Sequence, residues 1–89
     1  MTQSRVAITN ELGLHLRAAA RLVVVANRHE AKVTLSANGK TVDGKSLLGI
    51  TSLLAKKGTV VTIEADGADE KAAISALVTL IQDGFNTTS

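Results

Sequence analysis

Residues 32–43, which read KVTLSANGKTVD, predict a tight β-hairpin. Apolar and polar residues alternate in the first half of this stretch, as in a strand that buries one face. Asn38-Gly39 follows, and both residues tolerate the positive φ angles that a two-residue hairpin turn requires. We therefore expect two antiparallel strands joined at this pair, the second formed by residues 40–43.

Periodic patterns on both sides of the hairpin predict two further strands and two long helices. Alternation of apolar and polar residues marks a strand, and apolar residues three and four positions apart mark a helix that buries one face. The strands cover residues 5–9 and 60–65, and one helix covers residues 16–28. The last helix has its core-facing residues at Ile74, Leu77, Val78, Ile81 and Phe85. Asp66 or Asp69 is expected to cap the last helix, because a short carboxylate side chain accepts hydrogen bonds from the free N–H groups of a helix start.

A third, shorter helix is expected to begin after Ser46 as N-cap and to end near residues 56–58, where two lysines and a glycine suit a helix C-terminus. On a helical wheel, Leu48 lies opposite the apolar side of this helix, and Leu47 and Thr51 lie between the two sides. The apolar side should hold Ile50, Leu53 and Leu54. Leu47 and Leu48 would then be partly exposed, either as ordinary surface residues or as a patch that docks a partner.

Together these elements follow the order βαββαβα. We expect an α+β open-faced sandwich, in which a four-stranded antiparallel sheet carries three helices on one face. At this length, residues 1–89 should form a single domain. Hydrophobic residues make up 45% of the chain, but Phe85 is its one aromatic residue, so the core should be aliphatic.

Composition argues against several classes of function. The chain has no cysteine for a disulfide, a thiolate nucleophile or a metal site, and its two histidines alone do not build a zinc centre. No apolar run is long enough to span a membrane, and residues 1–5 lead into a strand pattern without a signal peptide, so we expect a soluble cytoplasmic protein. A net charge of +2 and the lack of aromatic stacking residues argue against nucleic-acid binding.

One histidine stands where a glycine-containing turn meets the start of a predicted helix, in residues 10–17, NELGLHLR. The first N–H groups of a helix have no partner within it, and the aligned peptide dipoles favour an anion there. A ring nitrogen of His15 could therefore attack phosphorus at this position, and the guanidinium of Arg17 could hold the phosphate oxygens. The alternative is a plain surface or capping histidine, which is the commoner case for so short a motif.

Charge is unevenly distributed along the chain. The first 57 residues carry nine Lys or Arg against three Asp or Glu, and the remaining residues carry one against five. A basic face near the predicted phosphate position would attract acidic partners, unless these charges only solvate the surface. The residues expected on this face are Arg17, Arg21 and Lys45.

With these motifs the chain resembles HPr, the histidine-containing phosphocarrier of the bacterial phosphoenolpyruvate-dependent sugar phosphotransferase system. The resemblance covers nearly the whole chain. It rests on four motifs in register, which are Asn10 with Gly13-Leu14-His15 and Arg17, the Asn38-Gly39 pair, Lys45-Ser46-Leu47, and Gly58-Thr59-Val60-Val61.

The resemblance implies a relay of phosphoryl transfers. His15 would accept the group on Nδ1, the pros nitrogen, from phospho-enzyme I and pass it to the IIA domain of a sugar permease. The backbone N–H groups of Leu16 and Arg17 would hold the phosphate, and the carrier itself would need no metal or cofactor. Such a protein is a stoichiometric carrier and not a stand-alone catalyst.

Ser46 is a second site that the resemblance implies. In some members of the family a dedicated kinase phosphorylates a serine at this place, with a phosphatase as its counterpart, and the added charge would weaken binding to an acidic partner. The alternative role of Ser46 is a plain helix N-cap. The expected docking surface consists of Leu16, Arg17, Arg21, Lys45, Leu47, Leu48 and Thr51.

Two residues depart from the family pattern, and two other functions stay open. Leu16 stands where a small residue is usual and Ala18 where proline is usual, which puts the rate of transfer and the choice of partner in question. One alternative function is that of a phosphocarrier in the nitrogen-regulatory branch of the same system. The other is a regulatory binding module that acts through phosphorylated Ser46 without carrying phosphate on His15.

Overall fold

The computed structural model describes residues 1–86, and their elements follow the predicted order. Residues 87–89, expected to belong to the same domain, lie outside the described part. The elements are β1 (Thr2–Ala7), α1 (Leu16–Asn27), β2 (Lys32–Ala37), β3 (Lys40–Asp43), α2 (Leu47–Thr51), β4 (Val60–Asp66), α3 (Glu70–Gln82) and a 3-10 turn, η1 (Gly84–Asn86).

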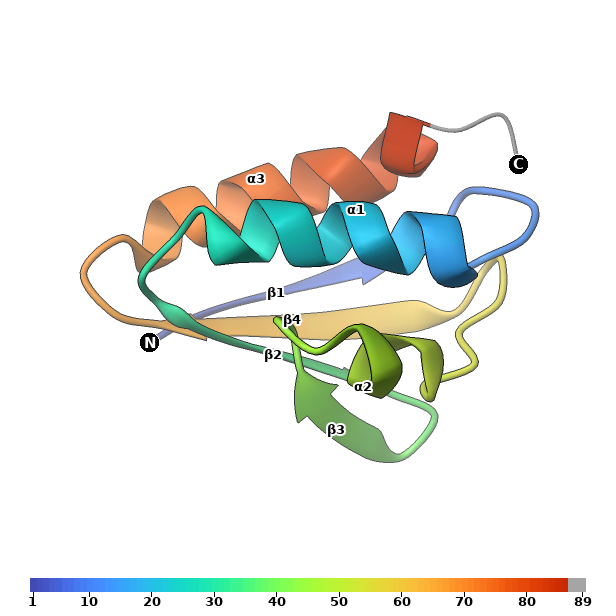
Figure 1. The fold of residues 1–89 in the computed structure, drawn as a ribbon, viewed down its shortest axis with the longest axis horizontal. Coiled ribbons are helices and arrows are strands. Elements are labelled where there is room, and N and C mark those ends of the chain that lie inside the picture. The colour runs from blue at the N-terminus through green and yellow to red at the C-terminus, as the bar shows by residue number, and fades with distance from the viewer. Residues whose placement is uncertain (87–89) are drawn as a thin grey trace.

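The strands form one antiparallel sheet with the order β1-β4-β2-β3 (Figure 1). β2 and β3 are joined by the predicted hairpin turn, in which Asn38 and Gly39 have φ angles of 53° and 77°. β4 lies between β1 and β2, so Val61 pairs with Val6 on one side and Ile63 pairs with Leu35 on the other. This arrangement confirms the predicted α+β open-faced sandwich.

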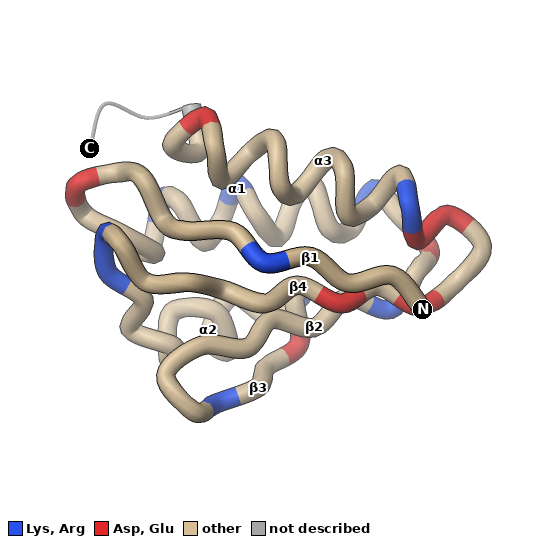
Figure 2. Tube along the Cα trace, turned by 180° about the vertical axis from the view of Figure 1, so that it is seen from behind, with Lys and Arg blue, Asp and Glu red and all other residues tan. Residues whose placement is uncertain are grey.

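The helices cover one face of the sheet. α1 and α3 run side by side across it, and the short α2 lies against α1 and β3 (Figure 1). Seen from behind, the strands lie in front of the helices and their outer face is open (Figure 2). The core between the layers is aliphatic apart from one aromatic ring, and its largest fully buried side chains are Phe85, Ile8, Leu22, Leu35, Ile50, Leu53, Ile63, Leu77 and Ile81.

The prediction for the end of α2 was wrong. The helix ends at Thr51 instead of continuing to residues 56–58. The N–H of Leu53 already turns to the carbonyl of Ile50, and Leu54 adopts a left-handed backbone with φ = 54°, which cannot continue a right-handed helix. Leu53 is buried as expected, but the turn directs Leu54 outward and leaves it 74% exposed.

Two other boundaries differ from the predicted ones. The first strand covers Thr2–Ala7 and not residues 5–9, because beyond Ala7 the N–H of Ile8 bonds to the carbonyl of Thr59 in a loop. The last helix ends at Gln82, and Phe85 lies beyond it in η1 with a left-handed backbone, φ = 61°. Phe85 is nevertheless fully buried. It therefore belongs to the core, as predicted, but not to the last helix.

Asp69 occupies the N-cap position of α3, but its carboxylate caps a different segment. Its two oxygens accept hydrogen bonds from the backbone N–H groups of Ala31 (2.8 Å) and Glu30 (3.0 Å). These bonds stabilise the ionised carboxylate and lower the pKa of Asp69, the bond from Ala31 most of all. A single side chain thus joins the α1–β2 loop to the start of α3.

We expect Asp69→Asn to destabilise the fold at pH 7, because a neutral amide offers one acceptor oxygen to two N–H donors. The folded-state pKa of Asp69 lies below the unfolded value, so its contribution is fully present above pH 4 or so and is lost as the pH falls through the folded pKa. Urea unfolding of wild type and variant between pH 7 and pH 2.5 should therefore give curves that converge in acid.

Glu64→Gln is the control for this experiment. Within residues 1–86 its carboxylate has no hydrogen bond, so its removal should not produce a comparable pH-dependent difference. A gap between wild type and Asp69→Asn that stays constant down to pH 2.5 would contradict the role given to the carboxylate.

Candidate functional site

The loop between β1 and α1 is folded around a buried asparagine. Asn10 is buried, and its side-chain Nδ2 donates a hydrogen bond to the carbonyl of Gly13 (2.8 Å). The N–H of Gly13 donates in return to the carbonyl of Asn10 (3.2 Å). These two bonds close a compact turn and set the direction in which the chain leaves toward His15.

The same loop is held by the segment that precedes β4. The N–H of Leu14 bonds to the carbonyl of Ala55 (2.9 Å), and the Leu14 side chain is buried beneath the loop. Ile8 and Gly58 add two further bonds between the segments, from Ile8 N–H to Thr59 O (2.9 Å) and from Gly58 N–H to Ile8 O (2.8 Å). The backbone just before His15 is therefore held both by bonds within its own loop and by bonds to the segment that precedes β4.

Gly13 is required where the two segments touch. Its φ angle is +66°, in the left-handed region that favours glycine. A Cβ at this position would stand 2.3 Å from the carbonyl oxygen of Ala55 and 2.9 Å from the Cα of Lys56. Both contacts are with backbone, so no side-chain movement would relieve them.

His15 is the N-cap residue of α1, as the sequence predicted. Its backbone is extended (φ −72°, ψ 175°), and its carbonyl accepts the first helical hydrogen bond from Ala19 (2.9 Å). The N–H groups of Leu16, Arg17 and Ala18 precede that bond, and the His15 side chain does not cap them. The position beside the ring is thus suited to an anion.

The two nitrogens of the His15 ring are in different surroundings. The ring is partly buried, and Nε2 is enclosed with no hydrogen-bond partner among the described residues. In a neutral imidazole only one nitrogen carries the proton, so a ring protonated at Nε2 presents the lone pair of Nδ1 for reaction.

His15 lines a shallow groove of about 470 Å³ between the start of α1 and the end of α2. Two residues expected on the docking surface, Leu16 and Thr51, line it as well. Leu12 and Leu14, which belong to the predicted motif of residues 10–17, also line it. The sequence did not place Leu54, Ala55 and Lys56 in this groove, because their position depends on the early end of α2, which no local pattern indicated.

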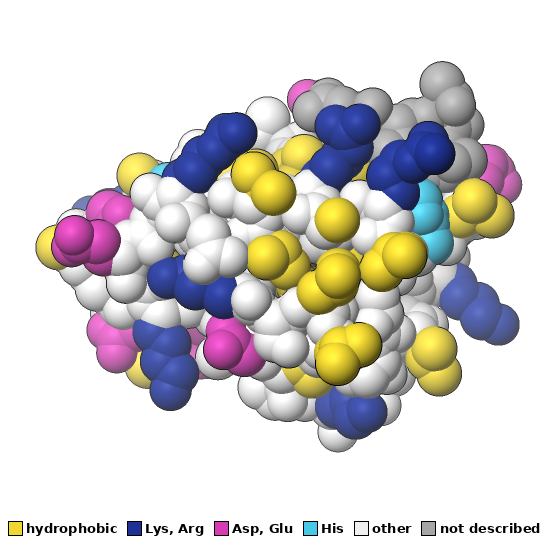
Figure 3. Space-filling view, in the orientation of Figure 1, with side chains coloured by type: hydrophobic (Ala, Val, Ile, Leu, Met, Phe, Trp, Pro, Cys, Tyr) yellow, Lys and Arg dark blue, Asp and Glu magenta, His cyan; other side chains and the backbone are white. Residues whose placement is uncertain are grey.

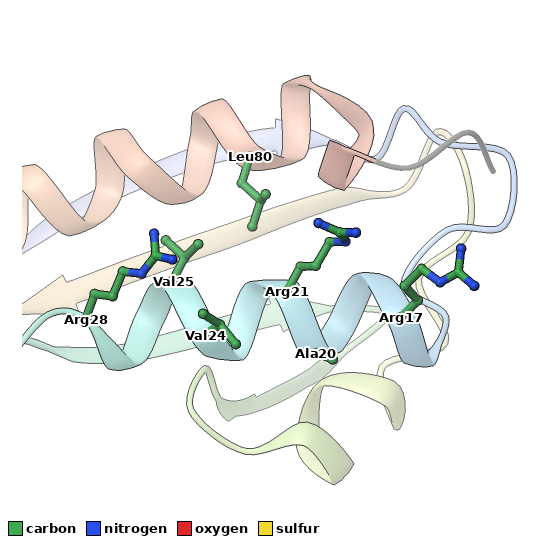
Figure 4. Close-up of a pocket in the computed structure, with 7 residues that line it drawn as sticks. All are labelled: Arg17, Ala20, Arg21, Val24, Val25, Arg28 and Leu80. Atoms are coloured by element: carbon green, nitrogen blue, oxygen red, sulfur yellow. The ribbon is translucent and has the colours of Figure 1, made fainter.

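A second groove, of about 430 Å³, runs between α1 and α3 (Figure 4). Arg17 and Arg21 line it from α1, and Arg28 lines it from just beyond the end of that helix. Arg21 and Arg28 reach toward α3, while Leu80 points from α3 toward α1. Within residues 1–86 none of these arginines is in an ion pair. The structure thus places Arg17 with Arg21 as expected, but in the groove beside that of His15.

Lys45 is not brought to His15. Its Nζ donates a hydrogen bond to the backbone carbonyl of His29 (2.8 Å), just beyond the C-terminal end of α1. His15 lies at the N-terminal end of this 12-residue helix, roughly 18 Å away along its axis. The basic face near His15 is therefore formed by arginines of α1, without Lys45.

Ser46 is the N-cap of α2, which confirms that expectation. Its Oγ accepts a hydrogen bond from the N–H of Gly49 (3.1 Å). Leu48, two residues on, is 82% exposed, whereas Leu47 is half-buried against the core. On this face of the molecule hydrophobic side chains gather over α1 and α2, with Lys and Arg side chains along the border toward α3 (Figure 3).

Comparison with known proteins identifies the family to which this fold belongs. A family model described as "PTS HPr component phosphorylation site" matches residues 2–83. The chain is 45% identical over 85 residues to the phosphocarrier protein HPr of Cupriavidus necator, with 96% of each chain covered. It is 41% identical over 86 residues to the HPr of Xylella fastidiosa strain Temecula1, with 97% of each covered.

A solved structure gives the same result. The crystal structure of HPr-C-His from Thermoanaerobacter tengcongensis superposes with a TM-score of 0.93 at 39% identity, and 98% of each chain is covered. The fold is thus that of a small phosphocarrier domain. The chain belongs to the HPr family, the phosphocarriers of the phosphotransferase system.

Two further features bear on the site's surroundings. Among residues 1–86, no cluster of three or more His, Cys, Asp or Glu side chains is placed to hold a metal ion. In the same part of the chain, no helix has the length and apolar character needed to cross a membrane.

Gly13→Ala and Gly39→Ala form a matched pair that tests the contact at Ala55. Both glycines have positive φ, so each alanine should cost about 1–2 kcal/mol in backbone strain. No atom lies within 4 Å of a Cβ at Gly39, whereas a Cβ at Gly13 meets backbone at 2.3 Å. In urea unfolding we expect Gly13→Ala to lose about 1–3 kcal/mol more than Gly39→Ala; equal losses would contradict the close approach.

Proposed function

We propose that this protein carries a phosphoryl group on Nδ1 of His15, taking it from phospho-enzyme I and passing it to the IIA domain of a sugar permease. The observation that carries the proposal is that His15 is the N-cap residue of α1, whose first N–H groups its side chain does not cap, and that Nε2 of its ring is enclosed. Membership of the HPr family supplies the class of reaction.

The proposed step is a direct exchange of one P–N bond for another. The lone pair of His15 Nδ1 attacks phosphorus, the P–N bond to the donor's histidine breaks, and the bonding pair returns to the donor ring. The proton on Nε2 of His15 need not move. In such a transfer the protein contributes position and charge neutralisation, here through the N–H groups of Leu16 and Arg17.

Docking would use the surface on both sides of His15. Leu16 and Thr51 line its groove, and Leu48 is exposed on α2. Arg17 and Arg21 line the adjacent groove, and neither guanidinium is in an ion pair with the described part of the chain. An acidic partner would be attracted by these charges and oriented by the apolar side chains. Leu47 and Lys45, which complete the expected surface, would contribute at its far edge.

The first test is phosphate transfer from labelled phosphoenolpyruvate through enzyme I. We expect wild type to take up a label that is labile in acid and stable in base, as a phosphohistidine is, and His15→Ala to take up none. His29→Ala is a matched control, because the Nδ1 of His29 is already hydrogen-bonded to the carbonyl of Val25 (3.1 Å). Label on His15→Ala, or its loss from His29→Ala, would contradict the assignment.

We further propose that phosphorylation of Ser46 lowers the affinity for these partners. The hydroxyl caps a short helix that carries the exposed Leu48 and contributes Thr51 to the His15 groove. A phosphate there would bring about −1.5 to −2 charges to the docking surface and repel an acidic partner.

Ser46→Asp and Ser46→Asn separate charge from capping, because both side chains cap helices well and only one is charged. We expect the KM for phospho-enzyme I to be about 3- to 10-fold higher for Ser46→Asp than for Ser46→Asn at low ionic strength, and the ratio to shrink in 0.5 M salt. The same KM for both variants at low salt would overturn the electrostatic effect.

A further inference from the structure

The backbone of Leu54 is strained, and the packing of its side chain does not offset that strain. Among residues 1–86, three residues other than glycine have positive φ, namely Asn38, Leu54 and Phe85. Asparagine tolerates this region, and Phe85 is fully buried, so packing offsets its strain. Leu54 has neither advantage, because it is a bulky residue whose side chain is 74% exposed. Such an outlier points to a functional use of the side chain.

The side chain of Leu54 lies in the groove of His15. Leu12 and Leu16, which are also exposed, line the same groove, so three accessible leucines surround the reactive ring. The N–H of Leu54 bonds to the carbonyl of Thr51 (3.3 Å), and the next residue, Ala55, holds the His15 loop through Leu14. Leu54 is therefore presented to the groove by a segment that is itself tied to the reactive loop.

We infer that Leu54 is a specificity-determining residue, which contacts an apolar side chain next to the phosphoryl-bearing group of a protein partner. This inference rests on the proposed function. The charged side chains around Leu54 indicate the chemistry of that partner. Lys56 lies in the same groove, and Arg17 and Arg21 lie in the adjacent one without an ion pair to any of residues 1–86. A complementary partner surface presents an apolar side chain flanked by carboxylates. An acidic protein offers such a surface, and a small phosphoryl donor does not.

Three substitutions of Leu54 separate backbone strain from side-chain contact. Leu54→Gly removes both the strain and the side chain, Leu54→Ala removes the side chain and keeps the positive φ, and Leu54→Met keeps an apolar side chain of similar size. Val60→Ala is the control, since Val60 is an exposed apolar residue of β4 on the open face of the sheet. Each variant is measured for thermal unfolding, for transfer from phospho-enzyme I, and for phosphorylation by phosphoramidate, a small donor without an apolar surface.

We expect the KM for phospho-enzyme I to rise about 5- to 10-fold in Leu54→Gly and Leu54→Ala, with kcat changed less than twofold. Leu54→Met should keep a KM near that of wild type, and Val60→Ala should not change it. Leu54→Gly should unfold at a temperature no lower than wild type, because the strain is relieved. Phosphorylation by phosphoramidate should be equal in all variants.

Three results would overturn the inference. An unchanged KM in both Leu54→Gly and Leu54→Ala would show that the side chain makes no contact with the partner. A parallel loss of kcat and of phosphoramidate reactivity would show that Leu54 acts on the His15 ring instead. Wild type that reacts with phosphoramidate but not with phospho-enzyme I would overturn the proposed function together with this role, whereas the first two results leave that function intact.

Discussion

The hydrogen bond from Leu14 N–H to the carbonyl of Ala55 joins the two loops that form the reactive groove. Gly13 lies against the same carbonyl so closely that no Cβ fits between them. On one side of the bond the chain continues directly to His15, and on the other side Ala55 follows Leu54. This backbone contact therefore helps to position both the His15 ring and the opposite wall of its groove.

Features that depend on residues close together in the chain could be predicted from the sequence. The Asn38-Gly39 turn needs only two residues that accept positive φ, and the N-cap role of Ser46 needs only its own helix. The carboxylate of Asp69 was assigned to its own helix but binds N–H groups nearly 40 residues away. Such long-range partners leave no periodic signal, and the early end of α2 at Thr51 is likewise not marked in the sequence.

The candidate site could likewise be predicted only where it depends on residues close together in the chain. The position of His15 follows from a turn and a helix start, both of which are local features of the sequence. The direction of the Arg17 side chain depends on the geometry of the helix, which the short motif does not indicate. Residues two positions apart on a helix point to different sides, and the structure accordingly places Arg17 in the α1–α3 groove beside that of His15. Lys45 is close to Ser46 in sequence, but its ammonium group is engaged at the far end of α1.

The openness of the His15 groove suits a carrier more than a catalyst. A phosphoryl group held in this groove would be accessible to water until a partner covers it. On contact with a partner, the exposed leucines at the rim of the groove would exclude water most effectively. The guanidinium groups act over a longer range, because unpaired charges attract an acidic surface before contact is made. Once a bound partner has excluded water from the groove, the N–H groups at the start of α1 would stabilise the transferred charge most effectively.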